Sequence, residues 1–149
     1  MPRFTFKLEQ VLRYREQLED QAKMALARCL AEYNACLARK KKIEAELANV
    51  ESKLFDGANA FSQSPGERWL LGNYCMGLKS DLHVLAQKTN SCEIAVHQAR
   101  SKLLRCSQDR QLLDKIKEKQ MERHAHEEKL REQRELDELT TTRRNISAF

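Results

Sequence analysis

The stretch DGANAFSQSPGE, residues 56–67, separates two long segments of helical character. It contains three of the chain's six glycines and prolines, Gly57, Pro65 and Gly66. Gly57 follows the last apolar residues of the first segment, where a C-terminal helix cap favours a residue without a Cβ atom. The sequence SPGE that begins at Ser64 has a hydroxyl at the N-cap, proline at the first helical position and glutamate at the third. The stretch therefore predicts a turn between two helices.

The composition is typical of a helical rod and not of a globular core. Of 149 residues only 4 are glycine and 2 are proline, 6% are aromatic and 33% are charged. The net charge is +5, but both signs are mixed along the chain, which indicates solvated helix faces more than a nucleic-acid surface. No apolar run approaches the roughly 20 residues that span a bilayer, and the N-terminus lacks the apolar core of a signal peptide. We therefore expect a cytoplasmic protein.

The two segments carry matching seams of apolar residues. The first seam runs from Leu8 to Leu54 and the second from Leu71 to Leu113, in steps of three and four residues. This is the a/d spacing of a coiled coil. The sequence therefore predicts an all-α fold, a single domain of residues 1–149 in which two long helices form an antiparallel coiled-coil hairpin. The expected elements are a helix of about 6–55, a turn of about 56–64 and a helix of about 65–142.

The position of the turn predicts which residues face each other. With the turn centred near residue 60, facing residues have numbers that sum to about 121, because both helices rise equally per residue. Cys29 then lies level with Cys92, within reach of a disulfide on oxidation. The second helix is longer and overhangs the first from about Lys117 to Arg144. Such an unpaired charged arm is expected to bind a partner.

The five cysteines are odd in number and contain no C-x-x-C pair, which indicates neither a disulfide framework nor a zinc site. We expect reduced thiols that pack as small hydrophobic side chains. They are Cys29, Cys36, Cys75, Cys92 and Cys106.

The chain contains no motif that predicts catalysis. Phosphate-binding, dinucleotide-binding and metalloprotease signatures are absent from the sequence, and a two-helix rod offers no enclosed pocket. His124 and Glu128 share a helix face, but two ligands make a weak metal site, and a solvated histidine is the favoured interpretation. We expect no enzyme activity, no metal and no cofactor.

Two further groups of residues each have two interpretations. The basic run of residues 39–42 is either a docking patch for an acidic partner or a solvated face offset by Glu44 and Glu46, and we favour the solvated face. Trp69, the only tryptophan, either folds over the turn to close the seam or serves as a binding anchor together with Tyr74. Both alternatives stay open for Trp69.

Three parts of the sequence resemble the flagellar type III export protein FliJ family. They are the opening FTFKLEQVLRYR of residues 4–15, the group Trp69, Tyr74 and Leu78, and the closing residues 129–143. Length and hairpin layout agree with the family over nearly the whole chain. The runner-up interpretations are a related injectisome stalk protein and a plain structural coiled-coil dimer.

The resemblance implies a soluble component of the flagellar export apparatus, peripheral to the inner face of the cell membrane at the flagellar base. Family members are similar to the central stalk of rotary ATPases, and their two chain ends enter the pore of the hexameric export ATPase. They also contact the cytoplasmic domain of the export gate and cycle export chaperones. The gate is expected to bind Trp69, Tyr74 and Leu78. Acidic loops of the ATPase are expected to meet Arg131, Arg134, Arg143 and Arg144. Outside the complex the chain is expected to be a monomer.

Overall fold

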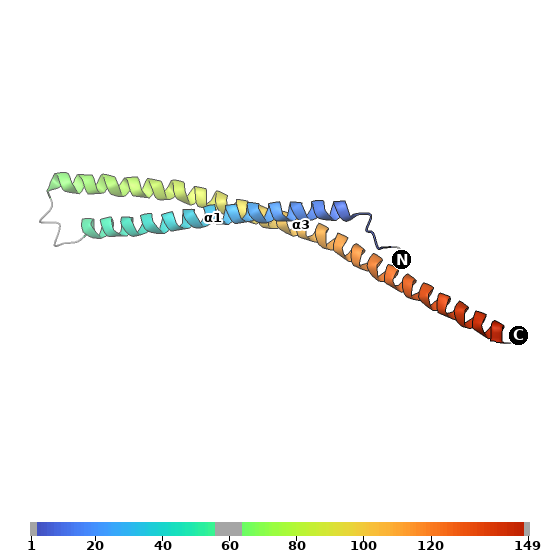
Figure 1. Ribbon diagram of the computed structural model, residues 1–149. Coiled ribbons are helices and arrows are strands. Elements are labelled where there is room, and N and C mark those ends of the chain that lie inside the picture. Colours follow the sequence, from blue (N-terminus) through green and yellow to red (C-terminus); the bar gives the residue numbers. More distant parts are fainter. Residues whose placement is uncertain (1–2, 56–63, 148–149) are drawn as a thin grey trace. The chain divides into compact units, whose positions relative to one another are not determined.

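The computed structural model describes residues 3–55 and 64–147 and contains two long helices packed against each other. Helix α1 spans Glu9–Phe55 and helix α3 spans Pro65–Ser147 (Figure 1). No strand occurs in the described residues, so the predicted all-α hairpin is confirmed. α1 begins at residue 9 where about 6 was predicted, and α3 continues to 147 where 142 was predicted. Residues 56–63, with the predicted cap at Gly57, lie outside the described residues.

The start of α3 has the predicted N-cap. The backbone N–H of Glu67 donates to the hydroxyl oxygen of Ser64 at 3.2 Å. The backbone N–H of Arg68 donates to the Ser64 carbonyl at 3.1 Å. The Ser64 hydroxyl therefore satisfies one of the amide groups that a helix start leaves without an intrahelical partner, and the Ser64 carbonyl accepts the first hydrogen bond within the helix.

The chain divides into two compact units, and each contains parts of both helices. The turn unit comprises residues 21–104, and the terminal unit comprises residues 1–20 and 105–149.

The turn unit is held together by the predicted apolar seam. Its best-packed part is a cluster of Val50, Cys75 and Leu78, whose side chains are 6 to 7% exposed. Further along the two helices, other seam residues are also buried, and Thr89 satisfies its buried hydroxyl by donating to the Leu85 carbonyl at 2.8 Å. One seam position was predicted wrongly, because Tyr74 is 47% exposed and its neighbour Cys75 is buried instead.

The predicted register of the turn unit is wrong. Cys92 lies against Cys36, with 4.0 Å between the two sulfur atoms, and not against Cys29. Lys79 Nζ lies 3.7 Å from the Glu51 carboxylate, so the numbers of facing residues sum to 128 and 130 for these two pairs. Cys29 is seven residues from Cys36, or about 10 Å along α1.

The error came from assuming a symmetric turn. With facing numbers that sum to about 128, the end of α1 at Phe55 lies level with about residue 73 of α3. The first two turns of α3, which begins at Pro65, therefore extend beyond the end of α1 (Figure 1). Trp69 belongs to these two turns.

In the terminal unit the seam uses other residues than predicted. Leu8 and Val11 are 41% and 42% exposed, whereas Phe6 and Leu12 are buried at 8% and 3%. Leu8 precedes the first residue of α1, where helical spacing no longer decides which side chains face the partner helix. The chain before α1 therefore packs through Phe6.

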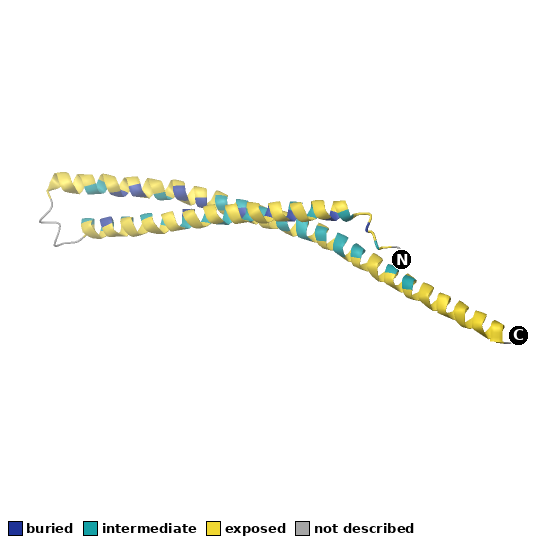
Figure 2. Cartoon of the chain, in the orientation of Figure 1, coloured by how far each residue is buried: buried dark blue, intermediate teal, exposed yellow. Residues whose placement is uncertain are grey.

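The overhang of α3 is shorter than predicted. Lys117 is not the start of an unpaired arm, because its ammonium lies 2.8 Å from the Glu9 carboxylate. The Phe4 ring lies 5.6 Å from the His124 ring, so the residues before α1 continue along α3. From residue 131 to residue 147 every residue is exposed (Figure 2). We call residues 131–147 the C-terminal arm.

Candidate functional site

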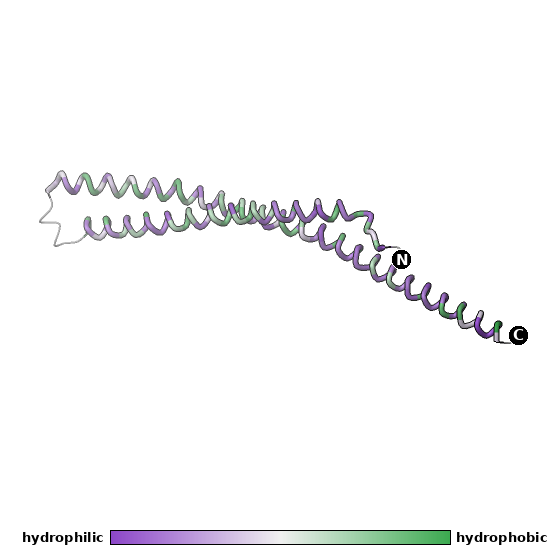
Figure 3. Tube along the Cα trace, viewed as in Figure 1, coloured by the Kyte–Doolittle hydropathy of each residue, from purple (hydrophilic) through white to green (hydrophobic). Residues whose placement is uncertain are grey.

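The C-terminal arm combines positive charge with an apolar stripe. Arginines were predicted to bind a partner here, and all four are exposed and form no ion pair with a described residue. They are Arg131, Arg134, Arg143 and Arg144. Leu136, Leu139 and Ile146 are 62 to 70% exposed, and steps of three and seven residues put them on one side of a helix. Figure 3 shows the C-terminal end of α3 as mainly hydrophilic with short hydrophobic interruptions.

Three consecutive threonines in the arm bond to their own helix. The hydroxyls of Thr140, Thr141 and Thr142 each donate at 2.8 Å to the carbonyl four residues earlier. Such bonds satisfy the hydroxyl locally and are often associated with helix bending.

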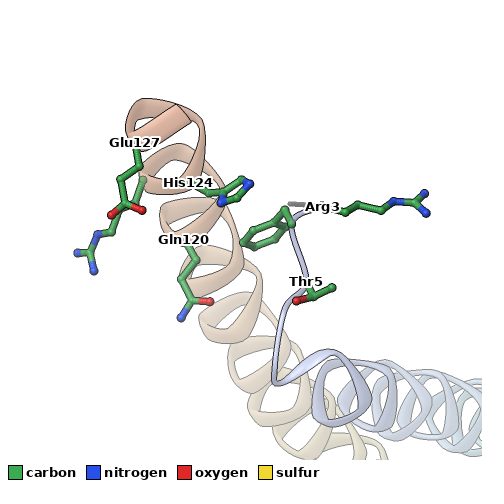
Figure 4. Close-up of a pocket in the computed structure, with 7 residues that line it drawn as sticks. Arg3, Thr5, Gln120, His124 and Glu127 are labelled. Atoms are coloured by element: carbon green, nitrogen blue, oxygen red, sulfur yellow. The ribbon is translucent and has the colours of Figure 1, made fainter. Parts of the chain in front are cut away.

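The arm begins next to a contact between the N-terminal segment and α3. Figure 4 shows the His124 ring and the segment of Arg3 and Thr5 facing each other across a shallow hollow, while the Arg3 side chain extends away from α3. His124 Nε2 lies 3.3 Å from the Glu128 carboxylate. No group of three histidine, cysteine or acidic residues with metal-binding geometry occurs in the described residues. In this structure His124 packs on the Phe4 ring and lies beside the Glu128 carboxylate.

A buried carboxylate ties the two helices of the terminal unit together. Glu19 is only 6% exposed and accepts a hydrogen bond from the Arg110 guanidinium, which also binds Asp114 at 2.6 Å. The pKa of Arg110 is raised mainly by its hydrogen bond to Glu19 and, to a smaller extent, by the negative charge of the same carboxylate. Arg15 adds a more exposed pair with Asp109 at 3.3 Å. These pairs were not predicted, although Arg15 and Arg110 occupy positions of the seam spacing and therefore indicated charged residues within the seam.

The residues predicted to bind the gate differ in exposure. Trp69 and Tyr74 are 67% and 47% exposed. Leu78 is buried in the core of the turn unit, so its side chain is assigned to the core and not to a binding surface. Two neighbours that the sequence analysis did not single out, Leu70 and Met76, are 62% and 71% exposed. We call Trp69, Leu70, Tyr74 and Met76 the tip surface.

The hydroxyl of Tyr74 lies near the Glu46 carboxylate of α1. Partial burial, followed by the charge of Glu46 and hydrogen bonding to it, raises the pKa of Tyr74 above its ordinary value. About half of the Tyr74 surface stays open to solvent.

Comparison with known proteins identifies the family. Neither helix has an apolar stretch long enough to cross a membrane within the described residues. No curated protein and no solved structure matches the chain significantly. The family model described as "Flagellar FliJ protein" matches residues 4–145 of the 149-residue chain. The motifs that resemble this family lie on the opening segment, the start of α3 and the C-terminal arm. The chain therefore belongs to the flagellar FliJ protein family.

Proposed function

We propose that this chain is a stalk-like coiled coil that couples the hexameric flagellar export ATPase to the cytoplasmic domain of the export gate, and that it assists the cycling of export chaperones. Family membership makes it a component of the flagellar export apparatus. The matched family consists of export components that are not enzymes. The more specific coupling role is supported by two exposed surfaces that lie in different units.

The C-terminal arm is the observation that carries the proposal. It continues α3 without a helix opposite it, and it exposes Leu136, Leu139 and Ile146 as one stripe beside four arginines. A helix that is polar on every side buries little apolar surface against a partner. An apolar stripe with flanking charge is the usual recognition face of a helix that docks in a groove. Inside an ATPase ring the stripe would meet apolar walls and the arginines would meet acidic loops.

The N-terminal end of the chain is held beside the start of the arm. Phe4 packs on His124, and the cation of Lys117 pairs with Glu9 and lies 6.0 Å from the Phe6 ring centre. These contacts support entry of both chain ends into the ring together. The buried carboxylate of Glu19 then resists separation of the two strands of the stalk.

The tip surface is the proposed contact with the gate. Trp69 stands on turns of α3 that extend past α1, and exposed aromatic side chains are enriched among residues that dominate binding energy. This arrangement favours the anchor interpretation of Trp69. Leu78 contributes by holding the two helices together beneath the surface.

Two other functions were considered. A related injectisome stalk protein is less supported, because the matching family model is the flagellar one. A plain coiled-coil dimer would bury the stripe of the arm against a second copy. Light scattering after size exclusion separates the dimer from both stalk interpretations, since our proposal expects a monomer of 17.4 kDa.

The test uses the full chain with three substitutions in the stripe, Leu136→Gln, Leu139→Gln and Ile146→Gln. We expect loss of ATPase binding and of ATPase stimulation, with an unchanged melting temperature. The matched control substitutes three exposed apolar residues elsewhere on α3, Ile94→Gln, Leu104→Gln and Leu112→Gln, which are 56 to 63% exposed. Normal stimulation by the stripe variant would contradict the proposal.

A further inference from the structure

Five cations lie at one level of the turn unit and pair with no carboxylate of the described residues. Four are the basic run of residues 39–42 on α1, and the fifth is Lys88 on α3, which faces Lys40 in the observed register. None of the five forms an ion pair with any residue that the structure describes. We call these five residues the basic band.

The carboxylates that were expected to offset the run do not pair with it. Glu44 and Glu46 follow the run in the sequence, but neither forms an ion pair with it in the described chain. Glu46 instead contributes to the raised pKa of Tyr74. The predicted offset of the run therefore does not take the form of ion pairs among the described residues, while three of its four cations are exposed to solvent.

Other cations near the helix interface behave differently. Lys79 pairs with Glu51 at 3.7 Å, Lys117 with Glu9 at 2.8 Å and Arg110 with Glu19. At the basic band, Lys40 is half-buried without such a pair. Like charges in proximity repel one another, so a bound ligand that supplies carboxylates would reduce the repulsion at this level of the hairpin.

An apolar cleft opens beside the basic band. Its volume is about 380 Å³, and it is lined by Arg39, Ile43, Asp81, Val84, Leu85 and Lys88. Val84 is 61% exposed and Leu85 is buried, so an aliphatic side chain entering here would contact a hydrophobic wall and floor. Arg39 and Lys88 supply positive charge at the rim from two different helices.

We propose that the basic band and this cleft bind an acidic amphipathic helix of a partner protein. One apolar side chain would enter the cleft over Val84, and carboxylates one turn before and after it would meet Arg39 and Lys88. The surface is separate from the tip surface and the C-terminal arm, so this proposal does not depend on the proposed function.

The lining of the cleft favours a protein over other polyanions. Single-stranded nucleic acid binds through aromatic platforms on which bases stack, and no aromatic residue lines this cleft. An anionic membrane binds helices that present a continuous apolar face beside their cations. Here the apolar surface is a cleft between helices, which suits a single inserted side chain.

The experiment measures binding of a labelled synthetic peptide to the full chain by fluorescence anisotropy. The peptide is a 15-residue alanine-based helix with a central leucine, two glutamates one turn before it and two glutamates one turn after it. We expect saturable binding in low salt that weakens strongly in 0.5 M NaCl, where the screening length falls below about 5 Å. Peptides with glutamine for glutamate or alanine for leucine should each bind more weakly.

A matched pair of double variants tests where the peptide binds. Arg39→Ala with Lys88→Ala should weaken binding roughly tenfold, since two charge contacts are lost. The control, Arg28→Ala with Lys102→Ala, removes the same two residue types from another level of the turn unit and should bind normally. Circular dichroism confirms that both variants are folded.

Three results would overturn the proposal. The first is no binding of the peptide at 1 mM. The second is an equal loss in the control variant, which would show that only net charge matters. The third is tighter, Arg39-dependent and Lys88-dependent binding of a single-stranded oligonucleotide or of vesicles with anionic lipid, which would assign the basic band to one of those ligands.

Discussion

Mild oxidation tests the register of the turn unit directly. The sulfur atoms of Cys36 and Cys92 are 4.0 Å apart, and a disulfide bond of about 2.05 Å requires an approach of about 2 Å, which side-chain rotation supplies. With a copper–phenanthroline catalyst and oxygen, the two thiols lose two protons and two electrons and form one bond. We expect a single intramolecular link between Cys36 and Cys92.

The size of the stabilisation follows from the loop that the link closes. Residues 36 to 92 form a loop of about 57 residues, and the loop-closure relation gives an entropy loss of about 14 cal/mol/K in the unfolded chain. At 25 °C this corresponds to about 4 kcal/mol of added stability. For a chain of this length such a gain raises the melting temperature by roughly 10 °C. Any strain in the link reduces this gain.

The rate of oxidation should depend on pH in a defined direction. Burial, followed by the hydrogen-bonding contact with Cys36, raises the pKa of the Cys92 thiol. A raised thiol pKa means that the folded state prefers the neutral form, and the associated stability is lost as pH rises through that pKa. Because the thiolate is the reactive species, oxidation should be slow near neutral pH and should accelerate as pH rises.

The assay combines non-reducing electrophoresis, peptide mapping and thermal unfolding with and without a reductant. Cys29→Ser should oxidise like the unmodified chain, whereas Cys36→Ser should lose the link and the added stability. A mapped link between Cys29 and Cys92, or an unchanged melting temperature in a fully linked sample, would refute the register and the loop argument respectively.

Four other outcomes are expected. Leu78→Ala should cost about 2 to 4 kcal/mol in urea unfolding because it leaves a cavity in the core, whereas Leu70→Ala at an exposed position should change stability by less than about 0.5 kcal/mol. Trp69→Ala should weaken binding to the gate domain in calorimetry while leaving the melting temperature unchanged, and a stability loss equal to that of Leu78→Ala would return Trp69 to the core. Glu19→Gln should lower the melting temperature more at low salt than at high salt, because it removes the carboxylate that pairs with Arg110 across the two helices and leaves only Asp114 of the same helix. A chain that ends at Leu130 should melt like the full chain but fail to bind the export ATPase, and retained binding would remove the arm from the interface.

The two helices and most of the buried seam positions could be predicted from the sequence alone. Period, capping residues and the paucity of glycine and proline all favour the same two helices, and Ser64 forms the predicted N-cap hydrogen bonds. Buried positions such as Val50, Leu85 and Val96 follow the three-and-four spacing. Agreement between local propensity and pattern is what makes such elements predictable.

The register could not be predicted from spacing alone. The sum for Cys36 and Cys92 is 128, which differs from the predicted 121 by seven residues, or one heptad. A shift of one heptad puts seam positions opposite seam positions again, so the apolar pattern fits both registers equally well. Individual pairs such as Glu51 with Lys79 distinguish them, and those depend on side-chain contacts.

The sequence predicted where along the chain the candidate binding surface lies, but not which residues form it. Whether an apolar residue near the end of a hairpin faces the core depends on its exact angle around the helix. At this end of α3 the angle puts Cys75 in the core and leaves Tyr74 exposed, whereas the spacing predicted the opposite. The angle also puts Leu78 in the core. The exposed Met76 escaped notice because methionine is common in both cores and binding surfaces.

The three consecutive threonines of the C-terminal arm determine where the helix of a docked arm would bend. The hydroxyl hydrogens are already donated to carbonyls one turn earlier, so Thr140, Thr141 and Thr142 offer a partner their methyl groups and oxygens that accept hydrogen bonds, but no hydrogen-bond donor. β-branched residues are also weaker helix formers than the glutamate- and arginine-rich sequence before them. A straight arm that enters a curved or moving channel would therefore adjust its direction at residues 140–142, and the apolar side chain of Ile146 beyond them would swing as one body with the last turn.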